Sequence, residues 1–233
     1  MSQISHVVIS IPAHNEATLL ASCLDSVRHA VAVACDFRPG LRAEIVVALD
    51  RCTDGTGDVA RARQVETVLS GRPGVGSARN AAIEAGLRLL DHPCLAQTWL
   101  ACTDADTVVP STWLVRQFMW AGRGIDLVLG TVHPDAFSDA RSRRIWRARH
   151  QLREGHLHVH GANLGVRADQ WQQLGGFEPL VSGEDVAFAA GVRRVTQNWV
   201  ATDSTRVMTS GRLNSRVEGG FADYLKDLPA SAQ

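Results

Sequence analysis

Apolar and polar residues alternate along the first half of the chain as a series of short strands and longer helices. Runs rich in β-branched residues predict buried strands at 6–11, 44–49, 65–69 and 99–103. Between them, apolar residues at helical spacing predict helices over 19–31 and 77–90, and a short helix after Asp54. Such alternation of strands and helices indicates a parallel sheet covered by helices on both faces.

The second half of the chain has a less regular pattern. Helices are predicted at 110–122, 138–154 and 168–174, with a further helix after Asp185. Strands are predicted at 126–132, 162–166, 200–203 and 206–209. No repeat, low-complexity stretch or linker separates this half from the first, so one α/β domain over 1–233 is expected.

The composition is that of an ordinary globular protein. The 233 residues are 45% hydrophobic and 21% charged, which excludes a disordered chain, a collagen-like repeat and a disulfide-stabilised mini-protein. Acidic and basic residues number 24 each, so the formal net charge is zero. A neutral chain is a poor candidate for bulk binding to nucleic acid, and no nucleic-acid partner is expected.

Cysteine content and the start of the chain bear on its compartment. The five cysteines are odd in number and form no C-x-x-C pair, which is typical of reduced thiols in a cytoplasmic protein. The N-terminus has no signal-peptide pattern, and no apolar run is long enough to cross a bilayer. We therefore expect a cytoplasmic protein with at most a peripheral association with membranes.

Polar residues follow three of the predicted strands, in the segments 12–16, 50–54 and 104–106. Ligands of parallel α/β sheets bind beyond the carboxyl ends of the strands, so these segments should meet at one edge. Asp104 and Asp106 could both face a divalent cation such as Mn²⁺ or Mg²⁺, which prefers oxygen ligands and leaves positions for phosphate. Taken alone, an Asp-x-Asp pair is more often a solvated turn.

Two further segments precede predicted helices. The glycine-rich segment 74–80 could hold a diphosphate through its backbone N–H groups and Arg79, or could be a simple turn. Glu184 and Asp185 follow Gly183 at a helix start, where a carboxylate serves either as a cap or as a general base.

Histidines and arginines are concentrated in the second half. His156, His158 and His160 alternate, and packing or cavity lining is favoured for them over a dedicated metal site. The arginines of 141–153 form a surface for which solvation is favoured over phosphate or lipid binding.

Taken together and in order, these segments resemble the family 2 glycosyltransferases, which have the GT-A fold. The matching segments are ISIPAHNE at 9–16, VVALDRCTDGT at 46–56, Gly76-x-x-Arg79-Asn80, Asp104-x-Asp106, Gly161-Ala-Asn163, Gly175-Gly176-Phe177 and Gly183-Glu184-Asp185. They cover residues from about 5 to 195. The resemblance implies a Rossmann-like mixed sheet flanked by helices, with a nucleotide-sugar-binding half at 5–109 and an acceptor-binding half and tail at 110–233.

The resemblance also implies a role for individual residues. The nucleoside would lie among Pro12, His14, Glu16 and Asp50, with Asp54 supporting that loop. Gly76 and Arg79 would lie near the diphosphate, Asp104 near the ribose or the metal, and Asp106 would bind Mn²⁺ or Mg²⁺. Ala162 and Asn163 would lie near the transferred sugar. Asp185 would be the base of an inverting transfer, with Glu184 as the alternative.

The implied activity is transfer of one sugar from a nucleotide-sugar, with UDP favoured, to a small or lipid-linked acceptor. His14 and Leu49 depart from the family pattern, and the Q-x-x-R-W motif of processive synthases is missing. Arg206, Arg212 and Arg216 are candidates to close over the diphosphate instead. A retaining transferase, a nucleotidyltransferase and a non-catalytic nucleotide-sugar-binding protein remain as alternatives.

Overall fold

A mixed sheet of eight strands forms the centre of the computed structural model, which describes residues 3–137, 139–150 and 152–212. The strand order is β3-β2-β1-β4-β7-β6-β8-β5. The strands are β1 (His6–Ala13), β2 (Arg42–Leu49), β3 (Glu66–Leu69), β4 (Thr98–Cys102), β5 (Thr107–Val108), β6 (Leu127–Pro134), β7 (Leu164–Arg167) and β8 (Trp199–Thr209).

Strand direction changes where the second half of the chain joins the first. Strands β3, β2, β1 and β4 are all parallel, as their alternation with helices predicts. Strand β7 then pairs antiparallel with both β4 and β6, while β8 runs parallel to β6. The fold is therefore the expected mixed sheet, and its two parts share one continuous hydrogen-bonded surface.

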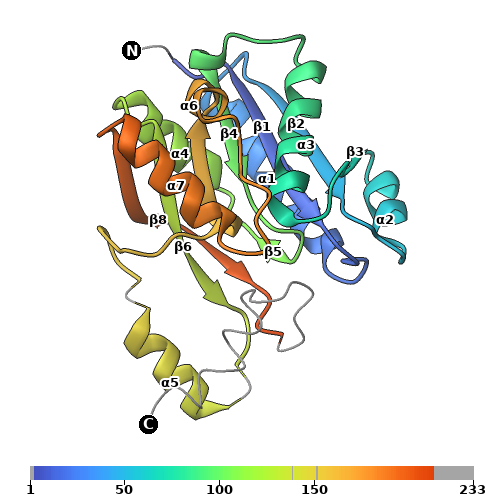
Figure 1. Cartoon of the computed structure of the whole chain (residues 1–233), viewed down its shortest axis with the longest axis vertical. Helices are drawn as coiled ribbons and strands as arrows, with labels where there is room; N and C mark the ends of the chain where they lie inside the picture. Colours follow the sequence, from blue (N-terminus) through green and yellow to red (C-terminus); the bar gives the residue numbers. More distant parts are fainter. Residues whose placement is uncertain (1–2, 138, 151, 213–233) are drawn as a thin grey trace.

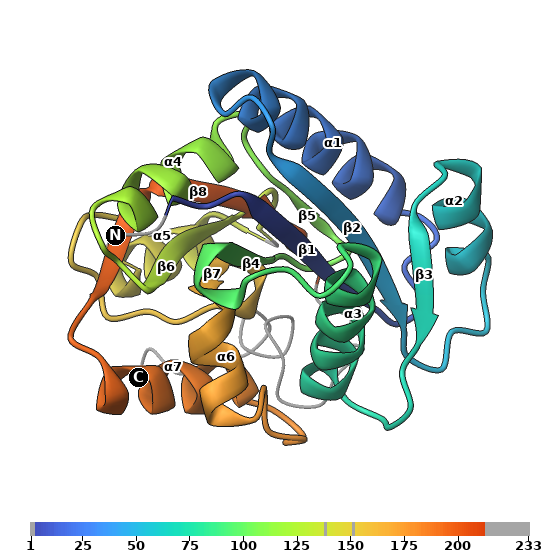
Figure 2. The ribbon, with the colours of Figure 1, turned by 90° about the horizontal axis from the view of Figure 1, so that it is seen from above.

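The helices form two layers, one on each face of the sheet (Figures 1 and 2). Helices α1 (Leu20–Phe37) and α4 (Trp113–Gly122) pack on one face. Helices α3 (Val75–Leu89), α6 (Ala168–Leu174) and α7 (Glu184–Val195) pack on the other. The short α2 (Thr56–Ala62) lies beside β3 at the edge. A separate apolar core lies between the sheet and each of the two main layers.

Close packing of α3 on β1 brings the helix directly over the strand that precedes the first polar segment. A Cβ added at Gly86 would lie 2.4 Å from Cγ1 of Val8, so only glycine fits this position. The approach places the start of α3 beside the carboxyl ends of β1 and β2.

The differences from the sequence prediction include the short strand β5, which was not expected, and the bounds of α5 and β8. The helix expected over 138–154 is shorter in the structure, where α5 covers Ala140–Arg149. It begins after Asp139, whose side chain caps it by accepting a hydrogen bond from the Ser142 N–H. Residues 138 and 151 lie outside the described residues. The strands expected at 200–203 and 206–209 form one strand, β8, whose pairing with β6 shifts register between Gly130 and Val132.

None of the helices in the described part of the chain combines the length and the apolar character that crossing a membrane requires. Helix α5 stands apart from the two main helix layers, at the lower end of the molecule in Figure 1.

Candidate functional site

A cavity of about 810 Å³ opens beyond the carboxyl ends of β1, β2 and β4. The segments after these three strands supply one wall of the cavity, as the parallel topology predicts. Later parts of the chain complete the lining, with residues 159–162, 179–186, 209, 210 and 212. The cavity therefore brings together residues from both halves of the sequence.

Asp50 ties together the loops on the β1–β2 side of the cavity. Its oxygen Oδ2 accepts a hydrogen bond from the Gly74 N–H at 3.0 Å. Its oxygen Oδ1 accepts one from Nε of Arg51, also at 3.0 Å. The backbone carbonyl of Asp50 lies 2.5 Å from Nδ1 of His14. Asp50, His14 and Pro12 all line the cavity, so the start of α3 is held against the end of β1.

Asp54 lies outside the cavity lining and supports the loop that carries Glu16. Its carboxylate accepts hydrogen bonds from the N–H groups of Ala17 and Thr56. The Thr56 hydroxyl in turn accepts the Glu16 N–H at 2.8 Å. Asp54 therefore acts on the site through the backbone of Glu16.

Arg79 lies between two acidic residues at the centre of the site. Its side chain is only 2% exposed, with Nη2 at 2.7 Å from Oδ1 of Asp104 and Nη1 in an ion pair with Glu184. Burial opposes the charged form, but the two carboxylates raise the pKa of Arg79 above its usual value, so the guanidinium stays charged. Both Nη atoms are used by these two partners, so Arg79 joins the end of β4 to the start of α7. Arg79 also lines the cavity, and its expected place near a diphosphate stays a prediction.

Two motif glycines allow this arrangement by close approach. A Cβ at Gly161 would lie 2.2 Å from Nη2 of Arg79, and one at Gly76 would lie 2.6 Å from the carbonyl oxygen of Glu178. Gly76 is not part of the cavity lining, so its place is in the packing of α3 against the segment before α7. Gly76 therefore has a packing role here, and its expected place near a diphosphate stays a prediction.

The two acidic residues at the start of α7 differ in their surroundings. Glu184 is 4% exposed and paired with Arg79. Asp185 is more open and lines the cavity, with Oδ2 accepting the Gly161 N–H at 2.6 Å and Oδ1 accepting the Val186 N–H. Because Glu184 is held in a buried ion pair, Asp185 is the better placed of the two to act on a ligand.

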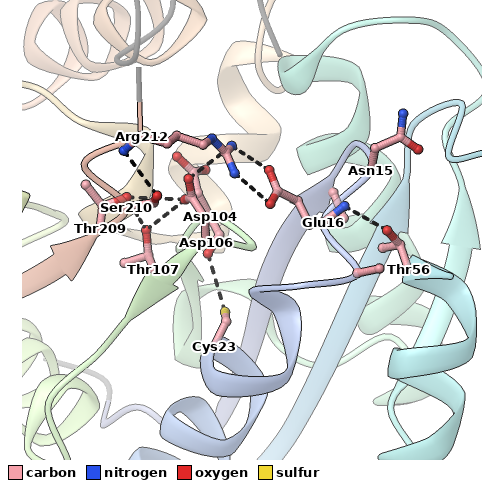
Figure 3. A network of polar contacts seen from close by, with 12 residues as sticks. Asn15, Glu16, Cys23, Thr56, Asp104, Asp106, Thr107, Thr209, Ser210 and Arg212 are labelled. Carbon is pink, nitrogen blue, oxygen red and sulfur yellow. Dashed lines mark hydrogen bonds and ion pairs between the residues drawn. The ribbon is translucent and has the colours of Figure 1, made fainter. Parts of the chain in front are cut away.

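Asp104 and Asp106 lie on the cavity wall at the end of β4, close to Glu16 (Figure 3). Burial, with the charge of Asp104 adding to it, raises the pKa of Asp106 to about 6. The lining as a whole has six carboxylates and three arginines, so negative charge is in excess. No group of three or more His, Cys, Asp and Glu side chains is arranged as a metal site within the described residues. Asp104 and Asp106 nonetheless suit Mn²⁺ or Mg²⁺. Protein sites often bind such an ion through only one or two carboxylates, and phosphate oxygens fill its remaining coordination positions.

The three arginines of the C-terminal segment have different positions. Arg212 enters the cavity and forms two hydrogen bonds with Glu16, at 2.8 and 2.6 Å, and an ion pair with Asp106 at 3.1 Å. Arg206 pairs with Asp203 outside the cavity lining. Arg216 lies outside the described residues.

Asn163, which the resemblance places near a transferred sugar, does not itself line the cavity. Its side chain is 1% exposed and forms three hydrogen bonds, with Nε1 of Trp113 and with the carbonyl oxygens of Thr131 and Thr205. Asn163 therefore joins β6 and β8 beneath the site. Its neighbour Ala162 does line the cavity.

The alternating histidines form a series of stacked rings. His158 stacks on His150 with ring centroids 4.7 Å apart, and His150 stacks on Trp146 of α5. His160 lines the cavity, and burial, with the neighbouring histidines adding to it, lowers its pKa to about 3. The packing and cavity-lining interpretation of these histidines is the one the geometry favours.

Several lining residues lack any signal in the sequence. The segment 179–182 and Thr209 line the cavity, yet neither belongs to a recognisable motif. Gly161 is different, because it stands in the Gly-Ala-Asn segment and its N–H holds Asp185.

A comparison with protein families matches residues 8–166 to the model described as glycosyl transferase family 2. The chain belongs to this family. A comparison with the sequences of curated proteins finds no match.

Solved structures of glycosyltransferases share the fold. S. aureus TarS 1–349 in complex with UDP-GlcNAc aligns with 15% identity and a TM-score of 0.65, covering 94% of this chain and 62% of that one. The mannosyltransferase PcManGT from Pyrobaculum calidifontis with GDP-Man and Mn²⁺ aligns with 20% identity and a TM-score of 0.63, covering 93% and 59%. This chain thus spans about three-fifths of the length of either protein.

Glucosyl-3-phosphoglycerate synthase from Mycobacterium tuberculosis, in complex with Mn²⁺, UDP and phosphoglyceric acid, is similar over a larger share of its length. It aligns with 20% identity and a TM-score of 0.61, covering 97% of this chain and 78% of that one. These likenesses show the GT-A fold.

Replacing Asn163 with alanine tests its structural role. We expect Asn163→Ala to lower the free energy of unfolding by about 3 kcal/mol or more, because each buried polar group left without a partner costs about 1–3 kcal/mol. Urea denaturation gives the stability, and calorimetry with a nucleoside diphosphate gives the affinity. A variant as stable as the wild type but with greatly weakened nucleotide binding would show that Asn163 contacts the ligand and would contradict the structural role.

Proposed function

We propose that this protein is a metal-dependent glycosyltransferase that moves one sugar from a nucleotide-sugar to a hydroxyl acceptor with inversion. The observation that carries the proposal is one cavity whose lining brings together Asp50 and His14, which follow β2 and β1, Asp104 and Asp106, which follow β4, and Asp185 at the start of α7. By the family resemblance these residues would meet the nucleoside, the metal with the diphosphate, and the acceptor.

The excess of negative charge in the cavity supports the need for a cation. A nucleoside diphosphate brings further negative charge to a lining that already has six carboxylates against three arginines. A bound Mn²⁺ or Mg²⁺ would stabilise the charge that develops on the leaving diphosphate. Asp104 and Asp106 are the residues that would hold it, with phosphate oxygens in the remaining positions.

The surroundings of Asp185 support its role as the base. A general base must lie within hydrogen-bond reach of the acceptor hydroxyl and must be held in place. The Gly161 N–H orients the carboxylate at 2.6 Å, while the side chain still faces the cavity. Asp185 would take the hydroxyl proton as the acceptor oxygen attacks the anomeric carbon and the nucleoside diphosphate departs.

The acceptor, by this proposal, enters past the segment 179–186, which contributes Leu180, Val181 and Val186 to the lining. Either a small molecule or a lipid-linked acceptor is compatible with this apolar margin. UDP is the first nucleotide to test, because TarS and glucosyl-3-phosphoglycerate synthase were solved with uridine nucleotides.

The metal-dependent part of donor binding should disappear in Asp106→Asn. Asparagine keeps the size of the side chain and can still accept the Thr209 hydroxyl, which now lies 3.2 Å from Oδ1. We expect UDP affinity in Mn²⁺ to fall at least about tenfold, with little change in metal-free affinity, because an amide is a much weaker cation ligand than a carboxylate. Isothermal titration calorimetry with UDP and GDP, with and without Mn²⁺, measures both.

Asp203→Asn is the matched control for this experiment. Asp203 also accepts a threonine hydroxyl and pairs with an arginine, but it lies outside the cavity lining. Its UDP affinity should equal that of the wild type. Mn²⁺-dependent binding that survives in Asp106→Asn would remove the Asp-x-Asp segment from the proposal.

Loss of the base should separate catalysis from donor binding. In Asp185→Asn the amide oxygen can still accept the Gly161 N–H, but the side chain cannot take a proton. We expect donor affinity within about threefold of the wild type and transfer, or donor hydrolysis, lower by roughly 10²–10⁴, the usual effect of losing a general base. Glu178→Gln, an exposed position just before the cavity-lining segment, should keep full turnover. Near-normal turnover in Asp185→Asn would reject this residue as the base.

A further inference from the structure

Arg212 occupies the place in the cavity where the acidic side chains converge (Figure 3). Its guanidinium forms a two-bond fork with Glu16, which is 5% exposed, and Nη2 also lies 3.1 Å from Oδ2 of Asp106. The residue follows β8, whereas Glu16 follows β1 and Asp106 follows β4. One positive charge thus joins three separate segments of the chain.

The other oxygen of Asp106 is already used within the protein. Oδ1 accepts the hydroxyl of Thr209 at 3.2 Å, and Thr209 itself receives the hydroxyl of Thr107 at 2.9 Å. Oδ2 is therefore the Asp106 oxygen that is left for a cation, and it is ion-paired with Arg212. An ion that binds Asp106 through Oδ2 must compete with this guanidinium.

We propose that Arg212 and the divalent cation exchange at Asp106, so that Arg212 neutralises the acidic residues in the absence of the ion and releases Asp106 when the ion binds. This inference rests on the proposed metal dependence of the function. The exchange replaces one positive charge by two, in a cavity that must then accept the negative charge of a diphosphate. Arg212 keeps the buried carboxylates paired before the donor arrives, which avoids the cost of leaving buried charges alone.

The exchange makes cation affinity depend on a residue that is not a metal ligand. Removing the charge of Arg212 leaves Glu16 and Asp106 with less positive charge nearby, so the carboxylates attract a cation more strongly. A purely structural role for Arg212 predicts the opposite, because loosening the segment 209–212 would weaken any site that includes it. The two accounts therefore differ in the sign of the effect.

Mn²⁺ binding to the nucleotide-free protein is the test, measured by calorimetry for the wild type, Arg212→Gln, Arg212→Lys and Arg206→Gln. We expect Arg212→Gln to bind Mn²⁺ on the order of tenfold more tightly than the wild type, because the competing charge is gone. Arg212→Lys, which keeps the charge, should lie close to the wild type. Arg206→Gln removes an arginine of β8 that pairs with Asp203 outside the cavity, and it should not change the affinity.

A second measurement follows the wild-type protein itself, and the charge-conserving variant serves only to assign one resonance. The ¹⁵Nε resonance of Arg212, assigned by its loss in Arg212→Lys, should shift when Mg²⁺ is added, while that of Arg206 should stay in place. The proposed exchange would be overturned by unchanged or weaker Mn²⁺ affinity in Arg212→Gln. It would also be overturned if the Arg212 resonance did not shift on addition of Mg²⁺. Those results leave the proposed function intact if UDP binding still requires Mn²⁺. UDP binding of equal strength with and without Mn²⁺ would overturn the metal dependence as well.

Discussion

A single buried guanidinium, that of Arg79, holds the two sides of the cavity in register. It comes from α3, and its two carboxylate partners come from the end of β4 and from the start of α7. Such a buried charge is tolerated only when it is paired, so the three elements cannot separate without leaving a charge alone in the interior. The positions of Asp104 on one wall and of Asp185 on the other both follow from this contact.

Negative charge in excess gives the cavity its chemical character. Carboxylates at the ends of parallel strands would repel a diphosphate unless cations accompany it. The protein supplies some of that charge itself, through Arg79 and Arg212, which both line the cavity. A divalent cation would supply the rest on the proposed account. On this account, the buried Arg79 fixes the positions of the site residues. The more accessible Arg212 pairs with Asp106 in the absence of a cation and releases it when a cation binds.

The parallel half of the fold and the three polar segments at its edge could be predicted from the sequence, because buried strands and amphipathic helices leave clear patterns. A strand near β7 was expected, but its antiparallel direction could not be read from the sequence. The long β8 was expected as two strands, because a strand that crosses a register shift looks like two separate apolar runs. Among the site residues, the burial of Asn163 beneath the cavity could not be predicted, because a motif does not say which way a side chain faces. Arg79 was placed at the site, but its burial between two acids depends on contacts 25 and 105 residues away. Arg212 could be suspected only as one of several arginines.

The coupling between Arg79 and Glu184 tests the central claim most directly. It is measured by urea denaturation of Arg79→Met, Glu184→Gln and the double variant. Because Arg79→Met leaves the buried carboxylate of Glu184 unpaired, it should cost about 3–5 kcal/mol in the wild-type background. It should cost at least about 2 kcal/mol less when Glu184 is already glutamine, since contacting charges do not contribute additively. Additive effects, within about 0.5 kcal/mol, would contradict the view that this ion pair joins the two sides of the site.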